Sequence, residues 1–218
     1  MKSNIEYMNI SKSGYLYTTL IACVIFVDLV SSISTSKILH ITDTIQFPLS
    51  VIIVVMMYPI LDIIAELFGR GAYVFAVVAR LLAGMIFIFL CLIIIAMPHP
   101  ADWTHQADYE YILGFIPWVI IVDMTLSLLT SYINYKILYI LRVFFNKRFF
   151  IIRSYLSSVC AVFIKAVTVI TLIYMYRYGF WNALRYSINT ALYELFFLAI
   201  ISIIIPYIIF YIRKKYKI

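Results

Sequence analysis

Two carboxylates lie one helical turn apart in one of the most apolar stretches of the chain, YPILDIIAELFG at residues 58–69. Asp62 and Glu66 follow Tyr58 at i+4 and i+8, so the three side chains share one face of a helix. Pro59 removes the backbone donor that would bond the carbonyl four positions earlier, which predicts a kink here. Acids beside a kink in an apolar helix can form a binding site for a polar solute.

A charge at the centre of a membrane helix costs about 2.5–3.5 kcal/mol. Asp62 and Glu66 must therefore face protein, water or a ligand rather than lipid. One interpretation is a substrate site. The other is structural, with the acids paired to a basic residue such as Arg80 or Arg153 to lock the helix packing. These residues alone favour neither interpretation.

The composition requires a membrane protein. Of the 218 residues, 65% are hydrophobic and 12% are charged, whereas soluble domains have about 45–50% apolar and about 25% charged residues. The mean hydropathy is +1.03. We predict an all-α, polytopic membrane protein, a single six-helix transmembrane domain over residues 1–218. The predicted helices span residues 15–39, 47–68, 72–96, 112–140, 150–176 and 186–212.

The positive charges predict the orientation. If both termini are cytoplasmic, most basic residues fall on the cytoplasmic side, and only Arg177 and Arg185 dissent. The residues on that side are Lys2, Lys12, Arg70, Arg142, Lys147, Arg148, Arg213, Lys214, Lys215 and Lys217. The net charge of +7 is thus explained by topology and anionic lipid headgroups, not by nucleic acid. We expect a retained first helix rather than a signal peptide, and a place in the cell membrane, the inner membrane in a Gram-negative cell.

Other charges within the helices are weaker signals. We expect Asp123 and Lys165 to form an interhelix ion pair rather than a functional site. Glu194 either lines the cavity or lies at a helix end, and Asp28 belongs to no recognisable motif.

No enzyme class is indicated. The chain has no HExxH, GxSxG, P-loop or GxGxxG motif and no set of haem or metal ligands. Cys23, Cys91 and Cys160 form no CxxC pair, and we expect them to be small buried hydrophobic residues. The sequence therefore predicts neither catalytic residues nor a metal or cofactor, and favours transport.

The stretch at 58–69 resembles the helix-2 signature of the queuosine-precursor transporter family, also called the vitamin uptake transporter family. That family is similar to the substrate-binding subunits of energy-coupling-factor transporters. Its members read roughly P…D-[IL]-x-x-E-x-[YF]-G, and Asp62, Glu66, Phe68 and Gly69 match in register. Length and predicted topology fit as well, so the resemblance covers nearly the whole chain.

Three further segments resemble the family. SISTSKIL, at the end of the first predicted helix, resembles the family's run of small residues that closes with Ser-Lys, here Ser36 and Lys37. IIRSYLSS supplies Arg153 and Ser157 of an Arg-x-x-x-Ser motif. The tail IIPYIIFYIRKKYK carries a closing Pro-x-Tyr-like helix through Pro206 and Tyr207, and Tyr193 keeps the tyrosine of a Tyr-x-x-Lys motif. The chain departs from the family's polar residues at Tyr135, Leu138, Val162, Lys165 and Phe196.

The resemblance implies import of a 7-deazaguanine, such as the 7-cyano or 7-aminomethyl precursor or queuine, for salvage into tRNA modification. A carboxylate can accept the two parallel N–H groups of a guanine edge. We hypothesise that Asp62 or Glu66 binds that edge, that Tyr58 lines the same face, and that Arg153 and Ser157 meet exocyclic oxygens or fix the carboxylates.

The predicted substrate-binding set is completed by Tyr193 in the last helix. The expected partners are the small-molecule substrate and the lipid bilayer, with a homo-oligomer or energising partner subunits also compatible with the sequence. The alternative function is a membrane scaffold or assembly subunit in which the buried acids form structural ion pairs.

Overall fold

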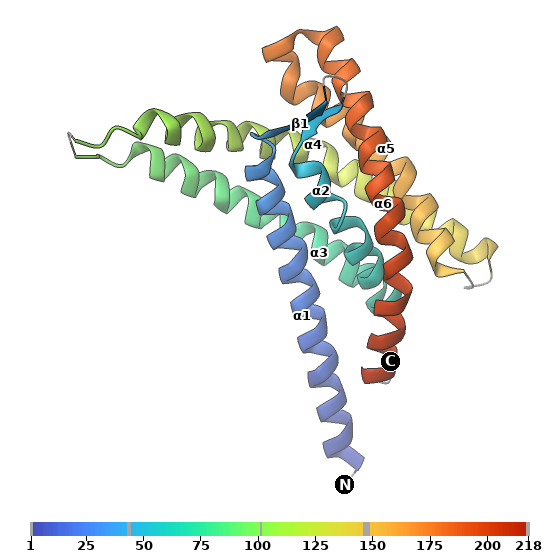
Figure 1. The fold of residues 1–218 in the computed structure, drawn as a ribbon. Coiled ribbons are helices and arrows are strands. Elements are labelled where there is room, and N and C mark those ends of the chain that lie inside the picture. Colours follow the sequence, from blue (N-terminus) through green and yellow to red (C-terminus); the bar gives the residue numbers. More distant parts are fainter. Residues whose placement is uncertain (1, 43–44, 101, 146–148, 217–218) are drawn as a thin grey trace.

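The computed structural model describes residues 2–42, 45–100, 102–145 and 149–216. The described chain is helical apart from one short hairpin and the connections (Figure 1). The all-α class is therefore confirmed. In chain order the elements are α1 (Lys2–Ser34), β1 (Ile38–Thr42), β2 (Ile45–Pro48), α2 (Ser50–Val54), α3 (Met57–Ala96), α4 (Gln106–Phe144), α5 (Phe150–Tyr178) and α6 (Phe180–Tyr216).

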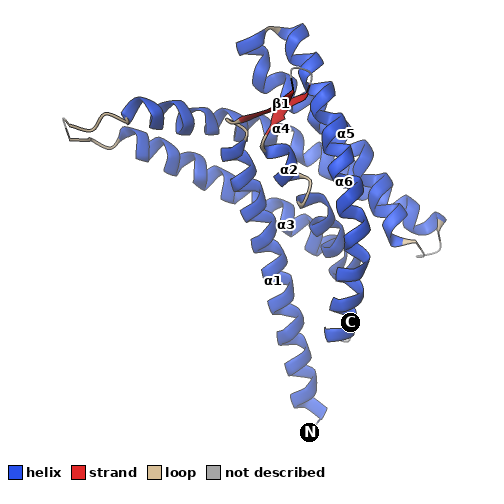
Figure 2. Ribbon diagram, viewed as in Figure 1, coloured by secondary structure: helices blue, strands red, loops and turns tan. Residues whose placement is uncertain are grey.

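The hairpin is the main difference from the prediction. The helix expected over 15–39 ends at Ser34, and β1 pairs antiparallel with β2, with Ile38 opposite Pro48 (Figure 2). The helix assignment of the last residues of 15–39 was therefore wrong. β-Branched residues concentrate here, at Ile38, Ile41 and Ile45 among others, and such residues pack well on a pleated strand.

The second predicted helix, 47–68, is interrupted. Residue 47 belongs to β2, α2 ends at Val54, and α3 begins at Met57. Pro59 lies in the first turn of α3, where its missing N–H is tolerated. The break that Pro59 predicts is confirmed, although it separates two helices rather than bending one.

A second break lies inside α3, which joins the rest of the second predicted helix to the third. Gly69 has a φ of 83° and a ψ of −173°, outside the helical region. Only glycine adopts such a conformation readily. In Figure 1 the chain runs down through α2 and the first part of α3. It then turns and runs along the second part of α3 toward the left of the view.

Five stretches of the described chain are long and apolar enough to span a membrane. They are Gly14–Ser34, Ser50–Ala96, Gln106–Phe144, Ile152–Tyr178 and Phe180–Ile204. The second contains 47 residues, which as one straight helix would measure about 70 Å, more than twice the hydrocarbon thickness of about 30 Å. The bend at Gly69 divides it into two arms that can each cross once, so six crossings stay a prediction that this bend supports.

The termini lie at the same end of the molecule. N and C are at the lower end of Figure 1, and the β1–β2 hairpin and the turn between α5 and α6 are at the upper end. This is the arrangement that the predicted topology requires, while the cytoplasmic assignment of the termini stays a prediction. Lys147, Arg148 and Lys217, which contributed to it, lie outside the described residues.

Five helices contribute to one apolar core cluster. Val24 of α1, Ile64 of α3, Leu138 of α4, Val162 of α5 and Leu198 of α6 are all at most 4% exposed and belong to this cluster. The second arm of α3 and the first half of α4 leave this body together in Figure 1. Their outward-facing apolar residues suit contact with lipid tails.

The cysteines are only partly as expected. All three are free thiols, and Cys91 is buried. Cys23 and Cys160 are exposed, so the expectation that they are buried was wrong. Both lie on membrane-length helices, where the outer face meets lipid and an apolar thiol costs little.

Candidate functional site

Four helices each contribute one charged side chain to a buried chain of ion pairs, which we call the charge network. Arg80 of α3 places its Nη1 atom 2.6 Å from Asp28 Oδ1 on α1 and 3.2 Å from Asp123 Oδ2 on α4. Lys165 Nζ of α5 lies 2.6 Å from Asp123 Oδ1. The predicted pair between Asp123 and Lys165 is confirmed. Arg80, by contrast, pairs with these acids and not with Asp62 or Glu66 in any contact that the structure shows.

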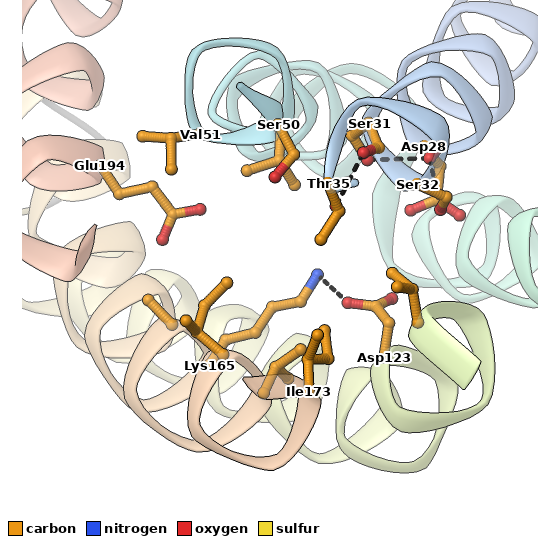
Figure 3. Close-up of a pocket in the computed structure, with 15 residues that line it drawn as sticks. Asp28, Ser31, Ser32, Thr35, Ser50, Val51, Asp123, Lys165, Ile173 and Glu194 are labelled. Carbon is orange, nitrogen blue, oxygen red and sulfur yellow. Dashed lines mark hydrogen bonds and ion pairs between the residues drawn. The ribbon is translucent and has the colours of Figure 1, made fainter. Parts of the chain in front are cut away.

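The charge network borders a pocket between α1, α2, α4, α5 and α6 (Figure 3). The space between its side chains is about 500 Å³, counting the part that opens outward. Apolar side chains such as Val51 and Val169 form much of its wall. Its polar residues are Asp28, Ser31, Ser32, Thr35, Ser50, Asp123, Lys165 and Glu194.

Glu194 enters this pocket from α6, opposite the charge network. Glu194 is 7% exposed, and its carboxylate points into the space between the helices (Figure 3). Within the described residues, no hydrogen bond or ion pair to Glu194 is found. The two alternatives for Glu194 are thereby resolved: it lines the cavity and lies in the middle of α6.

The serine and threonine residues around the pocket differ in whether their hydroxyl groups already have a hydrogen-bond partner within the protein. Ser31 and Ser32 donate to the carbonyl of Asp28, at 2.8 and 2.9 Å. Thr35 donates to the carbonyl of Ser31 at 2.9 Å. Ser50 is 6% exposed, and its hydroxyl has no hydrogen bond to any part of the chain that the structure describes. Ser50 can therefore donate to or accept from a ligand at no cost to the fold.

The β1–β2 hairpin lies next to the pocket, because Thr35 and Ser50, which line the pocket, flank the hairpin in sequence. Phe47 of β2 is 2% exposed and packs on Tyr193 of α6, with ring centroids 4.8 Å apart. Tyr174 Oη donates to the Thr35 carbonyl at 2.7 Å. The predicted site residue Tyr193 thus supports the hairpin beside the pocket rather than lining the pocket itself.

Asp62 lies elsewhere in the core. It is fully buried and accepts hydrogen bonds from Asn134 Nδ2 at 3.0 Å and Ser158 Oγ at 3.3 Å, and also from Ser154 Oγ. The donors belong to α4 and α5, so Asp62 joins three helices. It is not among the residues that line the pocket in Figure 3.

Glu66 is held by two arginines. Arg153 Nη2 lies 3.6 Å from Glu66 Oε1, and Arg142 Nε lies 3.9 Å from Oε2. The structural pairing of Glu66 with Arg153 is therefore confirmed. Glu66 also borders a hollow of about 350 Å³ beside the α3 bend, which Tyr135 and Leu138 line at positions where the chain departs from the family pattern.

The remaining predicted residues connect these two regions. Ser157 is buried and donates to the Ser154 carbonyl at 3.0 Å, beside Asp62. Tyr58 is 4% exposed and its ring centre lies 6.0 Å from Lys165 Nζ. Lys165 in turn lines the pocket, so Tyr58 stands between the Asp62 cluster and the charge network.

The family follows from comparison with known proteins. Residues 48–212 match the family model described as "Putative vitamin uptake transporter". The chain belongs to this family. Comparison with curated proteins and with solved structures finds no match. The matched segment contains Arg80, Asp123, Lys165 and Glu194, whereas Asp28 precedes it.

Membership in this vitamin uptake family, together with the apolar helices, identifies a multi-pass membrane protein whose family takes up small molecules. The suspected family is confirmed. Contact of Tyr58, Asp62, Glu66, Arg153, Ser157 and Tyr193 with a substrate stays a prediction. Within the described ranges, no group of three or more His, Cys, Asp or Glu side chains is placed to hold a metal ion.

The sequence prediction concentrated on Asp62 and Glu66 and gave little weight to Asp28, Ser50 and Glu194. One signal could have found the pocket. Five membrane-length segments each carry an ionisable residue well inside their apolar run, and such residues usually face the bundle interior and one another.

Proposed function

We propose that this chain imports a queuosine precursor across the cell membrane. The proposed substrate is a 7-deazaguanine, such as the 7-cyano or 7-aminomethyl precursor or queuine, used for salvage into tRNA modification. The family and the helix-2 signature around Asp62 and Glu66 support uptake of a small molecule. The substrate class comes from the resemblance of the sequence.

The observation that carries this proposal is the pocket with an unpartnered carboxylate at its wall. A buried carboxyl group without a hydrogen-bond partner costs about 1–3 kcal/mol, and more when it is charged. Glu194 is kept in such a place, and Ser50, with its uncommitted hydroxyl, and Lys165 line the same pocket. These groups supply acceptors and donors for a polar edge, and the valine and isoleucine side chains supply apolar contact for the faces of a flat ring.

The place of the pocket suits capture from outside. Thr35 and Ser50 put it beside the β1–β2 hairpin, at the end of the molecule away from both termini (Figure 1). With cytoplasmic termini, that end faces the exterior of the cell, or the periplasm in a Gram-negative cell. A carrier that loads there must then open toward the cytoplasm, either alone, as a homo-oligomer or with energising partner subunits.

The cluster around Asp62 and Glu66 has a supporting place in this proposal. Its contacts join α3, α4 and α5 directly beneath Tyr58 and Lys165. Direct contact of Asp62 with substrate has its own test, since Asp62→Asn exchanges an acceptor for a donor. Normal uptake by that variant, at matched protein level, would remove the assignment of Asp62 as a substrate ligand.

The scaffold alternative draws support from the same cluster. Asp62 and Glu66 are capped by side chains of α4 and α5, as structural staples would be. A scaffold gives no reason, however, for the buried Glu194 to face an open pocket without a partner. The position of Glu194 therefore favours a role in uptake over a role as a scaffold.

The test is uptake of labelled 7-deazaguanines by cells that lack their own precursor synthesis and import, with and without this protein. A cysteine placed in the pocket allows a thiol reagent to block the pocket, and so tests whether uptake passes through it. Ser50→Cys is nearly isosteric, and the background variant replaces the exposed Cys23 and Cys160 by serine. The control is His99→Cys, in the exposed loop after α3.

We expect cells with the protein to accumulate label, and a polar thiol reagent to block uptake through Ser50→Cys. Substrate added before the reagent should protect that variant. The His99→Cys variant should react with the reagent and keep its uptake. If cells with the protein accumulate no 7-deazaguanine, the proposed function is refuted. If the Ser50→Cys variant still takes up substrate after it has reacted with the thiol reagent, the pocket is not the route of uptake.

A further inference from the structure

The charged residues of the pocket and its network do not balance. Counting formal charges, Asp28, Asp123 and Glu194 supply three negative charges, and Arg80 and Lys165 supply two positive ones. They come from α1, α4, α6, α3 and α5 respectively, and α2 lines the pocket with Ser50 and apolar residues alone. One negative charge is left in excess.

That excess lies at Glu194. Asp28 is paired with Arg80 at 2.6 Å, and Asp123 is paired with Lys165 at 2.6 Å and with Arg80 at 3.2 Å. Asp123 also accepts from Ser127 Oγ at 2.7 Å. Glu194 has no such partner among the described residues, and its carboxylate points toward the centre of the pocket (Figure 3).

We propose that the substrate of this transporter is a cation whose ammonium group pairs with Glu194. The inference rests on the proposed function and narrows it. Among the 7-deazaguanines, the aminomethyl precursor and queuine carry a basic amine, whereas the cyano precursor is neutral. The pocket therefore selects the aminated substrates, since their charge neutralises the excess and satisfies a buried carboxylate.

Lys165 does not oppose this assignment. Its ammonium group is committed to Asp123 at 2.6 Å, so its charge is largely compensated before a ligand enters. An ammonium group has three N–H donors, and Asp123 takes one of them. Because Lys165 lines the pocket (Figure 3), the others can donate to an acceptor such as a ring carbonyl of a bound ligand. The substrate is thus held with its amine toward Glu194 and a carbonyl toward Lys165.

The experiment compares two ligands that share one ring system. Purified full-length protein in lipid nanodiscs is titrated with 7-aminomethyl-7-deazaguanine and with 7-cyano-7-deazaguanine. The variants are Glu194→Gln, which removes the charge, and Glu194→Asp, which keeps it. The control is Glu110→Gln, the same exchange at an exposed residue near the start of α4.

The natural protein should bind the aminomethyl ligand about tenfold or more tightly than the cyano ligand, which is the usual effect of one charged hydrogen-bonded pair. Glu194→Gln should lose this preference while its affinity for the cyano ligand stays within about threefold, which also shows that the variant is folded. Glu194→Asp and Glu110→Gln should keep the preference.

Equal binding of the two ligands by the natural protein would overturn the inference and leave the proposed function standing. A preference that persists in Glu194→Gln would overturn the role of Glu194. Absence of binding of both ligands and of queuine would refute the proposed function together with this inference.

Discussion

Replacing Asp62 by alanine tests whether this buried acid holds α3, α4 and α5 together. The substitution removes the acceptor for three side-chain donors, those of Asn134, Ser154 and Ser158. No part of Asp62 is exposed, so water cannot replace the lost acceptor without entering the core.

The expected loss follows from these contacts. Interhelical hydrogen bonds in membrane proteins contribute about 0.6 kcal/mol on average and about 1.7 at most. Three of them give about 2 kcal/mol. The two serines can turn back to carbonyls of their own helix, but the amide of Asn134 is left unsatisfied at a cost of about 1–3 kcal/mol. Because the cost at Asn134 already includes its lost bond to Asp62, we expect a total destabilisation of about 2–4 kcal/mol.

The assay is thermal unfolding of the purified protein in one detergent, followed by tryptophan fluorescence. For a chain of this size, about 2–4 °C per kcal/mol predicts that Tm falls by about 5–15 °C. Asp62→Asn keeps one acceptor oxygen and should lie between Asp62→Ala and the natural protein. Asp102→Ala makes the same exchange in an exposed loop and should leave Tm unchanged.

A Tm of Asp62→Ala within about 1 °C of the natural protein would refute the reasoning. It would mean that Asn134, Ser154 and Ser158 find other partners without cost, and that Asp62 is not needed for helix packing. The substrate-binding interpretation of Asp62 would then gain.

Two further substitutions test the bend and the charge network. Gly69→Ala should lower the free energy of unfolding by about 1–3 kcal/mol, because its φ of 83° suits only glycine. Gly71 has equally open space for a methyl group but a helical backbone, so Gly71→Ala should stabilise the protein slightly. Equal Tm values for the two variants would contradict this. Arg80→Met leaves Asp28 unpaired and Asp123 with Lys165 alone, so it should cost about 3–5 kcal/mol. Arg80→Lys keeps the charge and should be milder, and a Tm as low as that of Arg80→Met would show that geometry rather than charge decides.

Much of the fold could be read from local features of the sequence. Long apolar runs must be helices in a bilayer, because no other single segment satisfies its own backbone groups there. Pro59 and Gly69 mark the two breaks between α2 and the second arm of α3, since one lacks an N–H and the other permits a positive φ. The pairing of Asp123 with Lys165 was also predictable, because opposite charges in apolar helices seek each other.

The hairpin was missed because the mostly polar residues 40–46 look like a simple connection, while Ile38, Leu39 and Phe47 extend the apolar runs on either side. Over so short a run, hydropathy does not distinguish a strand from the end of a helix. Pairing decides the matter: Ile38 faces Pro48, and Phe47 packs against Tyr193 of α6, far away in the sequence. The contact of Phe47 with Tyr193 lies far outside any local window of the sequence.

The sequence alone determined that this is a helical membrane protein, that its helices break at Pro59 and Gly69, and which side chains are too costly to face lipid. It also fixed which residues share a face of one helix, because that depends only on 3.6 residues per turn. The tertiary structure decided which faces meet. Through helix packing, Asp62 accepts hydrogen bonds from amide and hydroxyl donors, Arg80 pairs with Asp28 and Asp123, and Glu194 faces a pocket. The sequence supplied the acids, but only the arrangement of all the helices determined which of them has no partner.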